Sequence, residues 1–469
     1  MDGLWSSEEM VDIISARPVG TLPETVSGIR SDPYALTAGC AFMALKTAAY
    51  DGHDHMTAAG KAGVGLAVVD EDRLVALGNT RLPLLVVRDV DVALDQLAAA
   101  GKARSRAKVI AVTGSAGKTM TARMLQAVLS KTGKVYLRTS DSGSGISLAL
   151  ALAGMPADAA FCVIEIPPGE YDPDHMDLLR PDVVVVTNAA SAKGKLETVL
   201  RPLFSALNKR GSVLINSDDR NHRAMAELAV KCRVKEIAYF GSRRRSDFAL
   251  GGYEPMPGGQ KMTAQIRGER VSVRLPVPGK DMALNAVAAL GAAAIAGAEP
   301  DAGAAELAGV KPETGRGRIF HPRGNAGTFK LIDESAHATP ASMRAGLERL
   351  GETRPGEGGS RIAVLGDMED ANKAQHVSLR KLLIEYSLDK VYLAGPQMAH
   401  LAEKLDPALA GGHFKDAARL NQALAGKINA GDVVLIKACP AMEFGTIVEN
   451  MPEPSSGLPE KNNAACPMG

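Results

Sequence analysis

The sequence predicts an α/β protein built from three domains. The chain has 469 residues, and a length of about 150 residues per domain gives about three hydrophobic cores. Runs of β-branched and other aliphatic residues alternate with helical segments over most of the chain. Such runs are typical of parallel strands that are covered by helices on both faces. Aromatic residues make up only 4% of the chain, so small aliphatic side chains are expected to fill the space between helices and sheets.

The first domain is expected to span residues 1–104. Its first helix should begin at residues 6–9, Ser-Ser-Glu-Glu, because serine caps and acidic residues favour a helix N-terminus. A polar turn over residues 50–55 leads into an alanine-rich helix, and a further helix is predicted over residues 90–100. The basic segment 102–106 is interpreted as the linker to the next domain. Strands are predicted over residues 40–45, 65–69 and 82–87.

The second domain is expected over residues 105–309, around a parallel sheet. Ligands bind beyond the carboxyl ends of parallel strands. Glu165, Asn188 and the polar run 216–219 lie at or near such ends and are therefore candidates for the ligand edge. The predicted strands are residues 109–113, 161–166, 183–188 and 212–216, followed by shorter strands over about 237–278 and a helix over 282–296.

The third domain is expected to be a further α/β unit over residues 310–451. Its clearest helix is predicted over residues 340–350. Residues 452–469 are polar and proline-rich, which predicts a disordered tail. The predicted strands of this domain are residues 329–332, 361–365, 390–393 and 433–437.

The composition is that of a soluble globular protein, with 46% hydrophobic and 23% charged residues. Lys and Arg number 54 and Asp and Glu number 53, for a net charge of +1, which argues against an electrostatic nucleic-acid binder. No apolar run approaches the roughly 18 residues of a membrane span, and the acidic start lacks a signal-peptide core. The cysteines show no metal-ligand spacing and are interpreted as reduced, which predicts a cytoplasmic protein. They are Cys40, Cys162, Cys232, Cys439 and Cys466.

The most informative stretch is a candidate phosphate loop at the end of the first strand of the second domain. After the apolar strand come Gly114, Ser115, Ala116, Gly117, Lys118 and Thr119, and then a helix start. Backbone N–H groups of such a loop and the helix N-terminus attract phosphate, Lys118 can reach the β- and γ-phosphates, and Thr119 can place a hydroxyl on Mg²⁺. The two glycines are two residues apart rather than the four of the full motif. The alternative is a tight strand–helix turn with a solvated lysine.

The chain also resembles the Mur ligase family, most closely its D-alanyl-D-alanine-adding branch, over about residues 25–450. Matches occur in order in all three domains, and such an order is hard to obtain by chance. The matching segments are residues 39–45 and 50–54, residues 113–119, Glu165 and residues 284–286, and finally residues 315–316, 333–335, 340–343, 364–368 and His376.

The resemblance implies a fold and a reaction. The first domain would be of the nucleotide-sugar-binding type, the second a P-loop ATPase domain with a parallel sheet, and the third a Rossmann-like domain that closes over ATP. ATP would phosphorylate a substrate carboxylate to an acyl phosphate, and an amine would then attack it. Catalysis of this kind depends on positioning and on cations near the transferred phosphoryl group.

The resemblance also assigns site residues. Lys118 would contact the phosphoryl group, Thr119 and Glu165 would bind Mg²⁺, and Asn285 would lie on the adenine side. Asp333 could take ribose hydroxyls and Arg316 a phosphate. Glu165 could instead cap the next turn, Asp333 could cap a helix, and Arg316 could form a surface ion pair.

The main departure from the family concerns a second Mg²⁺. Lys193 stands where the family has a histidine ligand, and a protonated lysine cannot ligate a metal. The family's carbamoylated lysine, which supports the same metal, corresponds to Leu200. Two interpretations follow: Lys193 supplies a fixed cation in a one-metal ligase, or the site has lost acyl-phosphate chemistry and keeps only binding.

Other departures concern substrate recognition. Residues 32–34 read Asp-Pro-Tyr where the family has Asp-Ser-Arg, which removes an arginine suited to anionic ligands. The scaffold is therefore kept while the carboxylate and amine sites look altered. The remaining departures are at residues 280–281, 336–340 and 437–440 and in the loop 140–145.

The histidines are given structural interpretations. His53 and His55, with nearby Asp51 and Asp54, resemble a metal cluster by residue type but are interpreted as a turn. His376 could serve the first turn of a helix or contact substrate.

The leading hypothesis is a cytoplasmic, ATP- and Mg²⁺-dependent amide ligase with non-standard substrates. Its partners would be a small-molecule carboxylate, which could be nucleotide-linked, and an amine, with no nucleic acid and no membrane, and the protein is expected to be a monomer. The alternative is a catalytically impaired Mur-ligase homologue that binds a nucleotide or a partner. A simple ATPase or P-loop kinase is disfavoured because the third domain would then lack a role.

Overall fold

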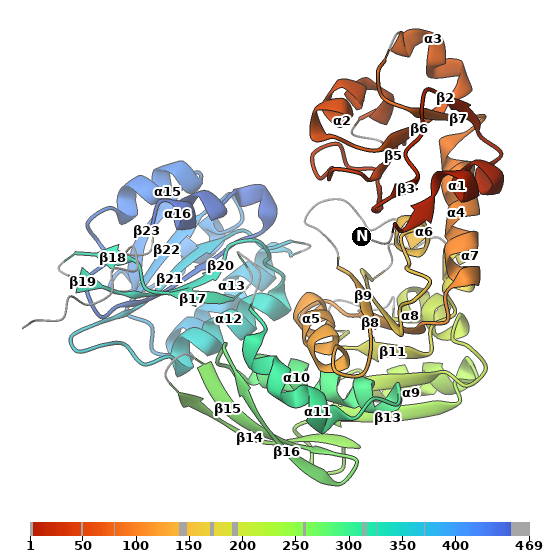
Figure 1. Cartoon of the computed structure of the whole chain (residues 1–469). Coiled ribbons are helices and arrows are strands. Elements are labelled where there is room, and N and C mark those ends of the chain that lie inside the picture. Colours follow the sequence, from red (N-terminus) through yellow and green to blue (C-terminus); the bar gives the residue numbers. More distant parts are fainter. Residues whose placement is uncertain are drawn as a thin grey trace, which may run out of the picture. The chain divides into compact units, whose positions relative to one another are not determined.

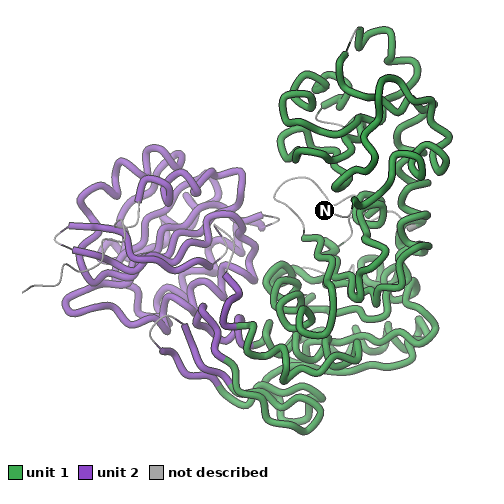
Figure 2. The backbone as a smooth tube through the Cα atoms, in the orientation of Figure 1, with its two compact units in different colours: residues 1–252, 263–273, 284–307 green, residues 253–262, 274–283, 308–469 purple. Residues whose placement is uncertain are grey.

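The computed structural model describes most of the chain and divides it into two compact units (Figure 2). The first unit comprises residues 1–252, 263–273 and 284–307, and the second comprises residues 253–262, 274–283 and 308–469. The described residues are 3–47, 50–78, 80–139, 148–168, 173–189, 196–256, 259–311, 315, 317–325, 327–369 and 371–451. The loop 140–145, Lys193, Arg316, Cys466 and the predicted tail 452–469 lie outside them.

A five-stranded sheet forms the N-terminal part of the first unit, in the order β2-β7-β6-β5-β4 (Figure 1). Its inner strands are parallel, and β2 pairs antiparallel with β7. Alternate residues face two cores: Met43 and Val68 face helices α1 and α4, whereas Phe42 and Val69 face the side of α2. The elements are β2 (Arg17–Val19), β4 (Ile29–Arg30), β5 (Ala41–Met43), β6 (Leu66–Asp70), β7 (Leu84–Val87), α1 (Ser7–Ile14), α2 (Met56–Ala62), α3 (Leu74–Leu77) and α4 (Val90–Arg104), with the short pair β1 (Trp5–Ser6) and β3 (Thr25–Val26).

A nine-stranded sheet follows, in the order β16-β15-β14-β13-β12-β11-β8-β10-β9. The strands from β13 to β9 are parallel. Its strands are β8 (Lys108–Thr113), β9 (Val135–Arg138), β10 (Phe161–Ile166), β11 (Val183–Val186), β12 (Ser212–Asn216), β13 (Glu236–Gly241), β14 (Phe248–Met256), β15 (Gly259–Ile266) and β16 (Glu269–Leu275). Its helices are α5 (Lys118–Leu129), α6 (Leu148–Ala153), α7 (Pro173–Leu179), α8 (Leu196–Ser205), α9 (His222–Lys231), α10 (Lys280–Ile295) and α11 (Pro300–Ala304).

The second unit contains a six-stranded sheet in the order β17-β20-β24-β21-β22-β23. Its strands are parallel except for β17. Val433 and Leu435 face a core with α12, α13 and α14, whereas Val434 and Ile436 face a core with α15 and α16. The elements are β17 (Arg318–Phe320), β18 (Arg323–Gly324), β19 (Gly327–Thr328), β20 (Lys330–Glu334), β21 (Arg361–Gly366), β22 (Lys390–Ala394), β23 (Ala410–Phe414), β24 (Val433–Lys437), α12 (Pro340–Glu352), α13 (Lys373–Glu385), α14 (Ala399–Ala402), α15 (Ala417–Leu424) and α16 (Gly445–Glu449).

The predicted α/β class with parallel sheets is therefore confirmed, while the three domain boundaries stay predictions. The predicted linker 102–106 is wrong in its first half, because α4 continues to Arg104. The Arg104 guanidinium stacks 3.2 Å from the ring centroid of Trp5 and donates to the carbonyl of Leu4 at 2.8 Å. The Trp5 indole N–H in turn donates to the carbonyl of Ala153 at 2.8 Å. These contacts hold the end of α4 as a helix and join it to the wider core of the first unit.

Among the helices of the described ranges, none has both the length and the apolar character that crossing a bilayer requires.

Candidate active site

The phosphate loop connects β8 to α5 in a conformation that requires its glycines. Gly114 and Gly117 have φ values of +138° and +79°. A Cβ on Gly114 would lie 2.1 Å from Oγ1 of Thr187, and one on Gly117 would lie 2.6 Å from Oδ1 of Asn285. Helix α5 begins at Lys118 and has no side-chain cap. The backbone is thus kept open for close approach at the positive end of a helix dipole.

Glu165 lies next to the loop because β10 pairs with β8, with Glu165 opposite Val112. The Thr119 hydroxyl donates to Oε2 of Glu165 at 2.9 Å, and Nζ of Lys118 lies 3.9 Å from Oε1 of the same carboxylate. Thr119 and Glu165 are 4% and 1% exposed. The structure therefore brings together the lysine, the hydroxyl and the carboxylate that the sequence predicted for one site.

Two residues at the end of β11, Thr187 and Asn188, also hold the loop; the sequence placed Asn188 at the ligand edge without assigning it a contact with the loop, and Thr187 was not named. Oδ1 of Asn188 accepts hydrogen bonds from the N–H groups of Ser115 and Ala116 at 3.0 and 3.1 Å and from the Ser115 hydroxyl. The Asn188 amide donates to the carbonyl of Ala116 at 2.9 Å, and the Thr187 hydroxyl donates to the same carbonyl at 2.6 Å. The available signal was the placement of Asn188 at a strand end.

The polar run after β12 supports this segment in turn. The Asp219 carboxylate accepts the N–H of Ala189 at 2.6 Å and the N–H of Asn221 at 2.7 Å. The side-chain amides of Asn216 and Asn221 donate to the carbonyls of Thr187 and Ala189 at 2.8 and 3.2 Å. The run predicted to lie at the ligand edge thus contacts neighbouring backbone.

Asn285, predicted for the adenine side, lies on α10 and is 8% exposed. Its contact with Gly117 places it directly beside the phosphate loop. Leu200, at the position of the family's carbamoylated lysine, is 3% exposed and belongs to the apolar core of the first unit.

In the second unit, Asp333 is fully buried and its carboxylate is used within the protein. Oδ2 accepts the N–H of Gly315 at 2.8 Å, and Oδ1 accepts the N–H and hydroxyl of Ser335 at 3.2 and 2.7 Å. These bonds fix the turn after β20. The ribose role of Asp333 and the phosphate role of Arg316 stay predictions.

A chain of charges, buried except for the half-buried Asp281, runs beside Asp333. Arg349 bonds Asp281 and, at 2.7 Å, Oε1 of Glu334, while Nζ of Lys437 donates to Oε2 of Glu334 at 2.6 Å. Burial alone would raise the pKa of Glu334, but the charges of Lys437 and Arg349 outweigh it and lower that pKa. Burial raises the pKa of Asp281, and Arg349 offsets this only in part. Lys437 also donates to the carbonyl of His337 at 2.8 Å, so the chain ties β24 to the loop after β20.

The histidines singled out in the sequence have structural partners. Nδ1 of His53 lies 2.7 Å from Asp51, and its Nε2 accepts the N–H of Asp70 at 3.0 Å. His376 is fully buried, with Nε2 accepting the N–H of Met368 at 3.1 Å and Nδ1 lying 2.9 Å from the carbonyl of Asn372. No group of three His, Cys, Asp or Glu side chains in the described part of the chain is arranged to hold a metal.

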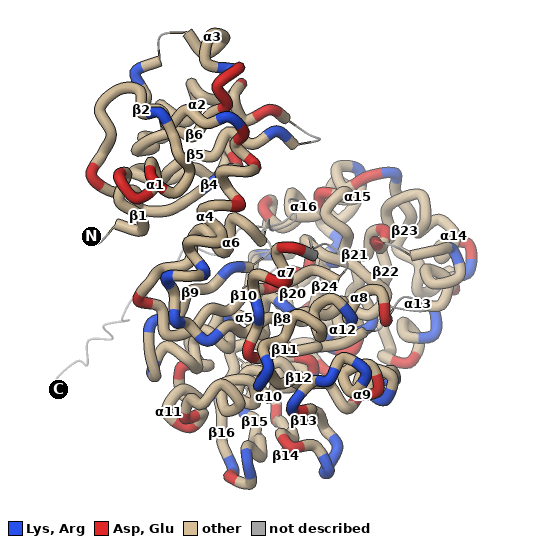
Figure 3. Tube along the Cα trace, turned by 90° about the vertical axis from the view of Figure 1, so that its right-hand side faces the viewer, with Lys and Arg blue, Asp and Glu red and all other residues tan. Residues whose placement is uncertain are grey.

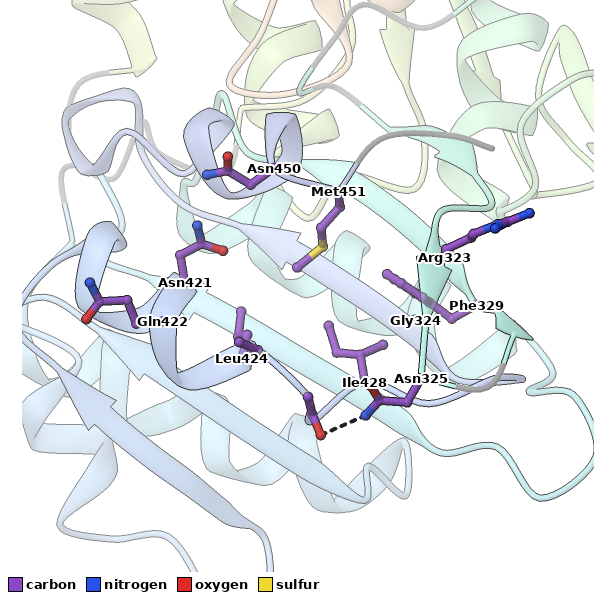
Figure 4. A pocket seen from close by; sticks show the side chains of 12 residues that line it. Arg323, Gly324, Asn325, Phe329, Asn421, Gln422, Leu424, Ile428, Asn450 and Met451 are labelled. Atoms are coloured by element: carbon purple, nitrogen blue, oxygen red, sulfur yellow. Dashed lines mark hydrogen bonds between the residues drawn. The ribbon is translucent and has the colours of Figure 1, made fainter. Parts of the chain in front are cut away.

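A cavity of about 500 Å³ lies in the second unit, and none of the residues that line it was predicted as a site residue (Figure 4). Phe329 and Ile428 line it just before β20 and β24 begin, whereas Asp333 and Lys437 lie at the carboxyl ends of these strands. Amide side chains of Asn325 and Asn421 also face it.

Acidic and basic residues are interspersed along the described trace (Figure 3). The charges of Lys118 and Glu165 at the phosphate loop are therefore a local feature, because neither positive nor negative charge dominates along the described trace.

The residues present fit a nucleoside triphosphate and a hard divalent cation. The glycine-lined loop, the uncapped start of α5 and Lys118 suit phosphate. The Thr119 hydroxyl and Glu165 carboxylate, 2.9 Å apart, supply oxygen atoms of the type that Mg²⁺ prefers.

Comparison with known families agrees with this geometry. A model of the Mur ligase middle domain matches residues 112–293, and a model of the Mur ligase glutamate ligase domain matches residues 317–439. Together the two matches cover more than half of the chain.

Individual proteins match over nearly the whole length. The UDP-N-acetylmuramoyl-tripeptide–D-alanyl-D-alanine ligase of Escherichia coli is 28% identical over 88% of this chain and 90% of its own. The crystal structure of MurF from Acinetobacter baumannii superposes with a TM-score of 0.77 at 22% identity, covering 95% of this chain and 98% of that one. MurF from Thermotoga maritima, solved in complex with ADP, has a TM-score of 0.71 at 21% identity and covers 90% and 96%.

Proposed function

The chain belongs to the Mur ligase family, and we propose that it is an ATP-dependent amide ligase that works through an acyl phosphate. The observation that carries the proposal is the arrangement of Lys118, Thr119 and Glu165 around one loop, with the Thr119–Glu165 hydrogen bond at 2.9 Å. The E. coli relative is named for joining a UDP-linked tripeptide to D-alanyl-D-alanine, which supports the reaction class.

The proposed reaction has two steps. A carboxylate oxygen of the first substrate attacks the γ-phosphorus of ATP, the bond to the β-phosphate oxygen breaks, and ADP leaves. The nitrogen of the second substrate then attacks the acyl carbon, the carbon–oxygen bond to phosphate breaks, and inorganic phosphate leaves. The amine loses a proton in this step, and an amide remains.

The chain's own residues would position and stabilise charge. Lys118 would hold the γ-phosphoryl group, because its ammonium lies at the start of α5 beside Glu165. Thr119 and Glu165 would hold one Mg²⁺, which when bound would neutralise charge on the transferred group. Asn285 would lie near the nucleotide through its contact with Gly117. Lys193 is proposed to supply a further cation, in place of a second metal.

The substrates are proposed to differ from those of the family members that carry the standard motifs. Tyr34 stands where the family has an arginine, and its side chain is 83% exposed. An exposed phenol cannot neutralise a diphosphate as a guanidinium does. A small carboxylate with less anionic character, and an amine, are therefore the proposed substrates of a cytoplasmic, monomeric enzyme.

A second function deserves a test because of Leu200. A buried leucine at the position of a metal-supporting lysine favours a homologue that binds nucleotide but has lost turnover.

The deciding experiment measures phosphate release from ATP over a panel of carboxylates paired with amines. Release that requires both partners and is lost in Lys118→Ala supports the ligase. ATP binding without turnover for any pair supports the binding-only alternative.

A further inference from the structure

We propose that Asn188 is a positioning residue, whose carboxamide presets the phosphate loop for nucleotide before nucleotide arrives. The inference rests on the nucleotide role that the proposed function gives to the loop. It extends that function to a residue which would touch neither the substrates nor the reacting atoms.

Both the oxygen and the nitrogen of the Asn188 carboxamide form hydrogen bonds with the loop. A single oxygen, Oδ1 of Asn188, accepts from two consecutive backbone N–H groups, those of Ser115 and Ala116, and from the Ser115 hydroxyl. The nitrogen of the same carboxamide donates back to the carbonyl of Ala116. One planar group thus binds both backbone N–H groups of the Ser115–Ala116 segment and the carbonyl of Ala116. Phosphate contacts are accordingly assigned to Lys118 and the first turn of α5.

Asn188 can do this because its own backbone is held. Its neighbour Ala189 donates to the buried Asp219 carboxylate at 2.6 Å, and its neighbour Thr187 accepts from Asn216 at 2.8 Å. The residues after β12 therefore hold the end of β11 by hydrogen bonds, and the end of β11 in turn holds the phosphate loop after β8. These three strands are parallel neighbours in the sheet. A loop held in this way loses less conformational entropy when it binds phosphate, since its dihedral angles are already fixed.

Two substitutions of Asn188 distinguish a role in positioning the phosphate loop from a role in the overall stability of the protein. Asn188→Ala removes all of the carboxamide contacts, and we expect the KM for ATP to rise about tenfold, as for one or two lost hydrogen bonds, with a smaller change in kcat. Asn188→Asp keeps the shape and the oxygen that accepts the Ser115 and Ala116 N–H groups. It loses the donor to the Ala116 carbonyl, which still accepts from the Thr187 hydroxyl at 2.6 Å, and it places a negative charge next to the phosphate site. We therefore expect Asn188→Asp to keep the loop ordered and still to bind ATP more weakly than Asn188→Ala at low salt, with the difference shrinking as salt is added.

Asn208→Ala is the matched control. Asn208 is also half-buried and bonds through its side chain, to Asp182, but it lies where β12 begins, at the opposite edge of the same sheet. Its substitution should lower stability without changing the KM for ATP. Should Asn188→Ala fail to fold, Asp219→Asn tests the same chain of contacts from one layer further away.

Hydrogen exchange on the nucleotide-free protein decides the inference independently of catalysis. Faster exchange at Ser115 and Ala116 in Asn188→Ala, but not in Asn188→Asp or Asn208→Ala, supports it. Unchanged exchange, or an unchanged KM for ATP in Asn188→Ala, overturns it. A wild-type protein that binds no ATP would instead overturn the proposed function, while the exchange measurement would still report whether Asn188 orders the loop.

Discussion

The hydroxyl of Thr119 donates a 2.9 Å hydrogen bond to the carboxylate of Glu165, and both side chains are almost completely buried. The two residues are 46 positions apart in the chain. They meet because α5 begins directly after β8 and because β10 is the neighbour of β8. The Thr119 hydroxyl, the Glu165 carboxylate and the Lys118 ammonium thus lie together where we propose that phosphoryl transfer occurs.

Replacing Glu165 with Gln should lower ATP-dependent phosphate release by about 100-fold, as for the loss of one preorganised charge at a reacting phosphoryl group. The glutamine oxygen can still accept the Thr119 hydroxyl, so the melting temperature should change little. The control is Glu236→Gln, because Glu236 also accepts a hydroxyl, that of Ser212 at 2.8 Å, but at the amino end of the sheet. Equal losses in both variants would contradict a special role for Glu165.

Replacing Gly117 with Ala should abolish ATP binding and destabilise the protein. The left-handed φ of +79° costs an alanine about 1–2 kcal/mol, and its Cβ would also press against Asn285. Gly268→Ala is matched in φ, at +87°, but a Cβ there would meet open space. Calorimetric ATP titration of both variants should therefore show binding only for Gly268→Ala.

Replacing Lys437 with Met should destabilise the second unit by about 3–5 kcal/mol, because it leaves a buried carboxylate short of one charge partner. Glu334 would keep its ion pair with Arg349 and lose the one with Lys437. The measurement is denaturant-induced unfolding, with the exposed pair Lys134–Asp158 as the comparison. A loss no larger than that of Lys134→Met would show that the buried chain contributes no more than a surface ion pair.

Stability in acid should depend on Asp51. Burial alone would raise the pKa of Asp51, but hydrogen bonds from His53 and from Arg73 outweigh it and lower the pKa to about 2. The folded-state pKa is thus below the ordinary value of 3.8. The contribution of Asp51 is fully present above about pH 4 and is lost as the pH falls toward about 2. In unfolding measurements from pH 2 to pH 5, Asp51→Asn should flatten the slope; an unchanged slope would exclude Asp51 as a source of it.

Much of the fold follows from continuous apolar runs. The strands at residues 161–166 and 212–216 were predicted with the bounds that the structure has, because each is a β-branched or aliphatic run with a clear start and end. The strand Ala410–Phe414 was not predicted, since two glycines and a histidine give it no apolar pattern. The extension of α4 was missed because its last turn is basic, which resembles a linker but also complements the helix dipole.

The site was predictable only where the chain carries a local motif. Lys118 and Thr119 follow from the loop itself, and Glu165 from its place at a strand end beside it. Asn188 and Asp219 could not be assigned their contacts, because these depend on the order of β8, β11 and β12 in the sheet. Ser115 and Asn188 are 73 residues apart, and no spacing rule in the sequence joins them. The buried chain through Arg349 depends on tertiary packing in the same way.

The most direct test of an acyl-phosphate ligase follows the oxygen atoms. Carboxylates of the panel are labelled with ¹⁸O, and the phosphate released from ATP in the presence of an amine is analysed by mass spectrometry. The account predicts one ¹⁸O atom in each phosphate, in amounts equal to the amide formed, and no release in Lys118→Ala. Unlabelled phosphate, or bound ATP that is never hydrolysed with any carboxylate and amine, would contradict it.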